Sequence, residues 1–114
     1  MEFVIKGELP DLNQIIKASK SHYMAYNNMK KDYTALVMIS AGNHPKIERA
    51  DVEITWYAKN RRKDPDNIAA GVKFILDGLV KGGVLENDGW NQINRITHDF
   101  AIDIENPRIE VKLK

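Results

Sequence analysis

Residues 51–59 alternate between apolar and mostly polar side chains, and this pattern constrains the fold more than any other stretch. The apolar positions are Val52, Ile54, Trp56 and Ala58. A period of two places successive side chains on opposite faces of a strand, so we expect one face of this strand to lie in a hydrophobic core. A sheet with one buried face needs a second layer against it. The stretch therefore predicts a sheet with helices packed on it.

Alternation also predicts the other strands. A short first strand is expected at residues 3–6. Residues 32–40 fit both a helical and a strand period, and their β-branched and aromatic content favours a strand. Residues 96–104 and 109–113 alternate on either side of the turn sequence "ENPR", which predicts a C-terminal hairpin.

Two stretches have helical spacing. Apolar residues recur at steps of three and four from Pro10-Asp11 to about Met29, with a break near residues 19–21. A second helix is predicted at residues 66–81, ended by Gly82-Gly83. The resulting fold class is α/β (α+β), with a small mixed sheet and helices packed on it. A chain of 114 residues is expected to form a single domain over residues 1–114.

Composition excludes several classes of protein. No apolar run approaches the roughly 18 residues of a membrane span, and the N-terminus is a poor match to a signal peptide. The chain has no cysteine, which excludes disulfides and thiolate metal sites and makes a cytoplasmic location the default. The net charge is only +1, so nucleic-acid binding must be argued from local clusters of charge.

A basic run leads into two aspartates at the start of the predicted second helix. The run comprises Lys59, Arg61, Arg62 and Lys63, and "DPDN" follows it at residues 64–67. Such a run is commonly a solvated loop. Asp64 can also cap the helix, Pro65 can begin it, and Asp66 suits the positive end of the helix dipole. The alternative is a metal site beside a loop that binds DNA.

A third carboxylate, Asp88, follows the helix in the stretch "LENDGW". Within the helix, Lys73 and Asp77 share the polar face with Asp66, at successive spacings of seven and four. Mg²⁺ prefers oxygen ligands and usually takes one or two protein carboxylates, with waters and phosphates completing its coordination. Two acids from one loop and a third from another meet that demand. Asn87-Asp88-Gly89 also suits a simple turn, so spacing alone leaves both interpretations open.

The blocks "DPDN", "KFILDGL" and "GVLENDGWNQI", in this order, resemble the RusA family of Holliday-junction resolvases, the crossover junction endodeoxyribonucleases. The resemblance implies that Asp64 and Asp66 are paired metal-binding aspartates and that Asp88 is the third catalytic carboxylate. It assigns Lys73 to the scissile phosphate or to ordering the acidic site. The chain departs from the family pattern in two ways. Asn87 stands where many members have an acid, and Lys73 follows Asp66 by seven positions instead of four.

The function implied by this resemblance is an endonuclease that cuts four-way DNA junctions in recombination and repair. We expect the three aspartates to hold one or two Mg²⁺ ions, with Mn²⁺ as a possible substitute. The basic run would guide the DNA backbone. Two opposed nicks require two sites, which a C2 homodimer supplies. Two alternatives stay open: a nuclease of broader range that acts on flaps and other branched DNA, and a non-catalytic DNA-binding module that keeps the fold.

Overall fold

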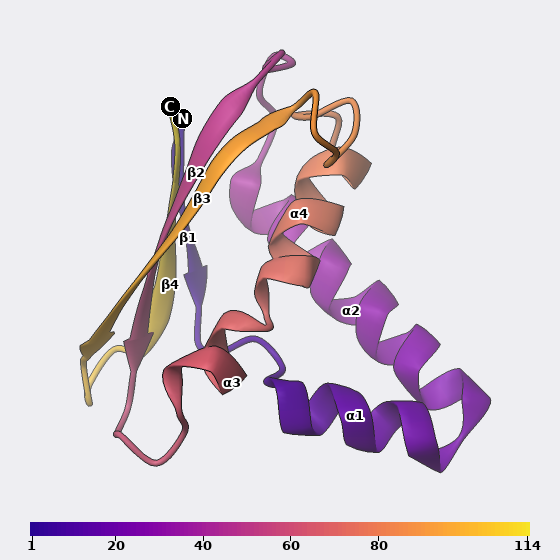
Figure 1. The fold of residues 1–114 in the computed structure, drawn as a ribbon, viewed down its shortest axis with the longest axis vertical. Coiled ribbons are helices and arrows are strands. Elements are labelled where there is room, and N and C mark those ends of the chain that lie inside the picture. Colours follow the sequence, from indigo (N-terminus) through magenta and orange to yellow (C-terminus); the bar gives the residue numbers. More distant parts are fainter.

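The computed structural model describes residues 1–114, and it consists of a twisted four-stranded sheet with helices on one face (Figure 1). The strands are β1 (Glu2–Lys6), β2 (Ala50–Ala58), β3 (Ile93–Ile102) and β4 (Arg108–Leu113). Their order across the sheet is β1-β4-β2-β3. β2 and β3 run parallel, whereas β4 is antiparallel to both of its neighbours, β1 and β2. The predicted mixed sheet is therefore confirmed.

The N-terminal helical stretch forms two helices, α1 (Leu12–Ser21) and α2 (Tyr23–Ala41). Asp11 begins α1 with a reciprocal cap, because its carboxylate accepts from the Gln14 N–H at 2.8 Å while the Gln14 side chain accepts from the Asp11 N–H at 2.9 Å. His22 separates the helices with an extended backbone, and its ring accepts from the Met24 N–H at 3.2 Å. The break lies one residue beyond the stretch predicted for it.

The strand predicted at residues 32–40 is wrong, because these residues form the second half of α2. Thr34 and Val37 are buried three positions apart, and Tyr33 and Leu36 pack on the core beside them. This helical face lies against α4 (Val72–Lys81), which covers the same side of the sheet. Burial between two layers outweighs the modest strand preference of the β-branched residues.

The predicted C-terminal hairpin is also wrong, because β2 lies between β3 and β4 and pairs with both. β2 is the most deeply buried strand, and its Val52, Ile54 and Trp56 are at most 3% exposed. The connection from β3 to β4 passes across the end of β2, where the Asp103 N–H donates to the Ala58 carbonyl at 2.8 Å. The most apolar strand takes the centre of the sheet, and the local turn does not decide the pairing.

The helix predicted at residues 66–81 is divided into α3 (Pro65–Ala69) and α4. At the division, the backbone of Gly71 packs so closely that a Cβ would lie 3.1 Å from atoms of both Leu9 and Trp56. α4 ends at Gly82 as predicted, where the Gly82 N–H donates to the Gly78 carbonyl at 2.9 Å. No helix has the length and apolar character that crossing a membrane requires.

The connection from β2 to β3 determines where the candidate residues lie. β2 and β3 are parallel, so the chain must return along the sheet between them, and α3 and α4 make this return (Figure 1). α3 consequently lies at the end of the sheet where β2 finishes. The loop after α4 lies at the opposite end, where β3 begins.

Candidate functional site

Asp64 and Asp66 lie at the beginning of α3, and both side chains are exposed. Asp64 occupies the N-cap position, and its carbonyl accepts from the Ile68 N–H at 3.1 Å. Its carboxylate makes no capping hydrogen bond, and neither aspartate forms an ion pair within the chain. The cap explains the backbone geometry of this segment and leaves both carboxylates free for a ligand.

Asp88 lies in the loop between α4 and β3, and its side chain is exposed and forms no ion pair. The Asp88 N–H donates to Asn87 Oδ1 at 2.8 Å. The N–H groups of Gln92 and Ile93 both donate to the Gly89 carbonyl, at 3.2 and 3.0 Å. The segment is thus a hydrogen-bonded turn, and this turn fixes Asp88 close to the first residue of β3.

Within one chain these two halves of the candidate site lie far apart. Asp64 lines a hollow together with residues 100–102, at the end of β3. Asp88 instead precedes Ile93, where β3 begins. A strand rises about 3.3 Å per residue, so the two ends of β3 are separated by about 30 Å, whereas Mg²⁺–oxygen bonds are about 2.0–2.1 Å long. In agreement, no group of three or more His, Cys, Asp or Glu side chains is placed to hold a metal ion.

Lys73 is exposed near the start of α4 and contacts Asp77 instead of Asp64 or Asp66. Its Nζ lies 3.6 Å from Asp77 Oδ2, and Lys30 Nζ of α2 lies 3.8 Å from the same oxygen. The Asp77 side chain is largely buried, and Oδ2 has no hydrogen-bond partner. The sequence indicated the pair of Lys73 and Asp77 by its spacing of four. It carried no signal for Lys30, because the packing of α2 on α4 is a long-range contact.

One residue of the basic run, Lys63, forms ion pairs within the chain, and the other three form none. Lys63 Nζ lies 2.9 Å from Asp11 Oδ2 and 3.5 Å from Glu8 Oε2, and the hydrogen bond with Asp11 raises the pKa of Lys63. The other three basic side chains are exposed and form no ion pair; they are Lys59, Arg61 and Arg62. Arg61 lines the same hollow as Asp64. Free cationic groups therefore stand directly beside the first two carboxylates.

A family model described as endodeoxyribonuclease RusA matches residues 10–114 of the chain. The chain belongs to the RusA family. This RusA-family protein is accordingly an endodeoxyribonuclease, and its family resolves Holliday junctions and acts on branched DNA. Nucleases of this kind generally use divalent metal ions. No curated protein matches the chain.

The side chains offered by this RusA-family chain suit a divalent metal ion in their chemistry. Asp64, Asp66 and Asp88 present carboxylate oxygens, which are the ligands that Mg²⁺ and Mn²⁺ prefer. None of the three forms an ion pair with a cation of the same chain, so each carboxylate is available to a ligand. Carboxylates without partners are costly beside DNA phosphates unless a cation lies between the carboxylate and the phosphate.

Proposed function

We propose that this protein is a Mg²⁺-dependent Holliday-junction resolvase that makes paired symmetrical nicks as a homodimer. The observation that carries this proposal is the pair of unpartnered carboxylates, Asp64 and Asp66, beside three unpartnered basic side chains in a chain of the RusA family. The acids are the metal ligands, and the basic residues neutralise the DNA backbone that would otherwise be repelled by them.

The residues have separate roles in this proposal. Asp64 and Asp66 hold the metal together with Asp88 of the partner subunit, because the Asp88 side chain of the same chain lies at the opposite end of the sheet. Lys59, Arg61 and Arg62 bind flanking phosphates. When bound, Mg²⁺ supplies a water of lowered pKa and stabilises the charge that develops on the phosphate. Lys73 supports the scissile phosphate: its ion pair with Asp77 is long, and its side chain is about half exposed, so a phosphate can replace that weak contact.

The proposal is tested with a mobile four-way junction, a flap and a linear duplex, each incubated with Mg²⁺, Mn²⁺ or EDTA. We expect paired nicks at symmetrical positions of the junction, and no cutting in EDTA. Cutting of all three substrates would indicate a nuclease of broader range. Binding without cutting under every condition would contradict catalysis altogether.

The residue assignment is tested with Asp66→Asn. This variant should lose cleavage while it binds the junction as tightly as the wild type or more tightly, because a charge that repels DNA is removed. Asp32→Asn is the matched control, since Asp32 is an exposed aspartate of α2 with no ion pair. Undiminished cleavage by Asp66→Asn would refute the assignment.

A further inference from the structure

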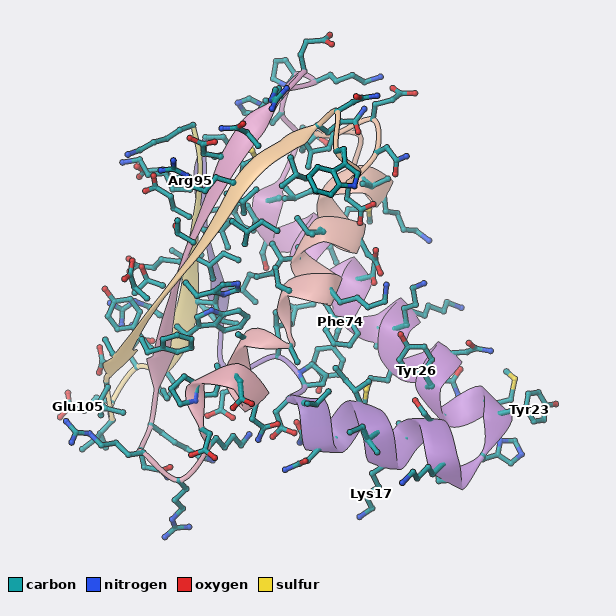
Figure 2. All side chains as sticks on the ribbon, in the orientation of Figure 1. Lys17, Tyr23, Tyr26, Phe74, Arg95 and Glu105 are labelled. Atoms are coloured by element: carbon teal, nitrogen blue, oxygen red, sulfur yellow. The ribbon has the colours of Figure 1, made fainter.

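The helix that carries Asp66 and begins directly after Asp64, α3, is too short to hold its own position. It has five residues, and isolated helices shorter than about 12–15 residues are only marginally stable in water. No residue of α3 is buried, and only Ile68 packs against the core from its side. α4 differs, because Phe74 is fully buried and its ring centroid lies 5.8 Å from that of Tyr33 in α2 (Figure 2). The position of α3 therefore depends on polar contacts around the two aspartates.

Two such contacts flank the aspartates, and both are made with the connection between β1 and α1. The first involves Lys63, directly before the first aspartate, whose Nζ lies 2.9 Å from Asp11 Oδ2. The second involves Asn67, directly after the second aspartate, whose Oδ1 accepts from the Asn13 N–H at 3.1 Å. The segment between these contacts contains both carboxylates of the candidate site. Its two ends are thus attached to the same short stretch of chain.

A third contact follows just beyond α3, at Gly71. A Cβ at this position would lie 3.1 Å from Leu9 Cβ, so the backbone itself meets the connection. The three contacts are spaced four residues apart, and their partners in the connection all lie within residues 9–13, which we call the platform. Leu9, Pro10 and Asp11 of the platform are buried, and the ring of Pro10 fixes its backbone. A rigid platform therefore supports a short helix that has little stability of its own.

We propose that Asp11 and Asn67 are positioning residues, which hold the metal-binding segment on the platform. Lys63 and Asn67 are partly buried, whereas Asp64 and Asp66 are exposed. The contacts with the platform thus fix the backbone and leave both carboxylates open to a ligand. Carboxylates held in place bind a metal ion without the entropy loss of ordering their segment. The inference rests on the proposed function, in which Asp64 and Asp66 bind the metal.

Asp11 has a second effect, because it keeps a lysine away from the metal ligands. Lys63 directly precedes Asp64, and its side chain is long and flexible. Without Asp11, the Lys63 ammonium group can pair with the neighbouring carboxylate and compete with a metal ion for it. The Asp11 carboxylate is fixed, since the residue is 5% exposed and accepts from the Gln14 N–H at 2.8 Å. Glu8 is a weaker partner of Lys63, at 3.5 Å.

The first test measures amide hydrogen exchange in the metal-free protein. The Ile68 N–H donates to the Asp64 carbonyl, so its exchange rate reports on α3. Asn67→Ala and Asp11→Asn should each raise this rate about tenfold, while the Gly82 amide at the end of α4 keeps its rate. Asparagine retains the helix cap, so Asp11→Asn removes the ion pair alone. An unchanged Ile68 rate in either variant would overturn the inference for that residue.

The second test measures Mn²⁺ affinity by titration calorimetry. Asn67→Ala and Asp11→Asn should each raise the dissociation constant about tenfold, as is usual when a residue that orients metal ligands is lost. Lys63→Arg preserves an ion pair with Asp11 and should bind Mn²⁺ as the wild type does. Gly78→Ala is the matched control, because it disturbs the packing of α4 on α2 away from α3. Equal loss of affinity in this control would reduce the effect to general instability and overturn the inference.

Cleavage of a four-way junction separates the inference from the proposed function. Asn67→Ala and Asp11→Asn should cut more slowly at low Mn²⁺ and regain the wild-type rate at saturating Mn²⁺, because mass action fills a weakened site. Asp66→Asn lacks a ligand and should stay inactive. Faster exchange and weaker Mn²⁺ binding in the variants, without cleavage by the wild type, would refute the nuclease mechanism and leave the positioning roles standing. Cleavage by the wild type, with unchanged exchange and Mn²⁺ affinity in the variants, would refute the positioning roles alone.

Discussion

Replacing Gly78 with alanine perturbs the contact that holds α4 against α2. A Cβ at this position would lie 2.5 Å from Val37 Cγ1 and 3.0 Å from the Thr34 carbonyl oxygen. Both neighbours resist displacement, because one is a β-branched side chain that is fully buried and the other is backbone. Alanine gains about 1 kcal/mol of helix propensity, while overpacking a core costs about 1–3 kcal/mol. The upper part of that range applies here, so we expect Gly78→Ala to lower the free energy of unfolding by about 1–2 kcal/mol.

The measurement is urea unfolding followed by the fluorescence of the buried Trp56, with the midpoint compared at an unchanged m-value. Gly89→Ala is the matched control, because the nearest heavy atom to its Cβ would be the Gln92 side-chain oxygen at 3.8 Å. The control should be neutral or more stable by up to about 1 kcal/mol, since alanine restricts the unfolded chain. If Gly78→Ala were as stable as the wild type, the close packing of α2 on α4 would not be a constraint on the fold.

Three further predictions concern charge. Burial alone would raise the pKa of Asp11, but hydrogen bonds from the Gln14 N–H and from Lys63 outweigh it and lower the pKa. The stability that Asp11 contributes is therefore present above about pH 3.9 and is lost as the pH falls through the lowered pKa. Asp11→Ala should remove this acid dependence from thermal unfolding. The same variant should lower the free energy of unfolding at pH 7 by about 1–2 kcal/mol. Burial lowers the pKa of His98, whose Nδ1 accepts from Trp56 Nε1 at 3.0 Å. The unfolded state then binds more protons, so stability should fall as the pH drops below about 6.5, and a flat profile of unfolding midpoint against pH would contradict this. Arg62→Gln should weaken junction binding and reduce its salt slope by about one, whereas Lys63→Gln, which breaks the contact with Asp11, should lower the unfolding midpoint more than it changes the slope.

The parts of the fold that could be predicted are those fixed by local geometry. Residues 51–59 allow one period only, and the structure buries the predicted face. Residues 32–40 satisfy two periods, and the deciding contact is Gly78, which lets α2 approach closely and lies outside the ambiguous stretch. The pairing of β3 with β2 could not be predicted locally, because it depends on β2 being more deeply buried than the other strands. The turn sequence "ENPR" between β3 and β4 does not show that β2 lies between these two strands in the sheet.

In the candidate site, too, the local arrangement could be predicted and the long-range arrangement could not. Asp64 and Asp66 could be assigned together because they share one turn of chain. Asp88 follows within 25 residues, and closeness in sequence indicated closeness in space. The parallel pairing of β2 and β3 opposes this expectation, because a parallel crossover must return the chain to the starting end of the sheet before the next strand. A residue directly after β2 and a residue directly before β3 then lie at opposite ends in any single chain with this topology. In the proposed homodimer, the metal site therefore needs Asp88 of the partner subunit beside Asp64 and Asp66.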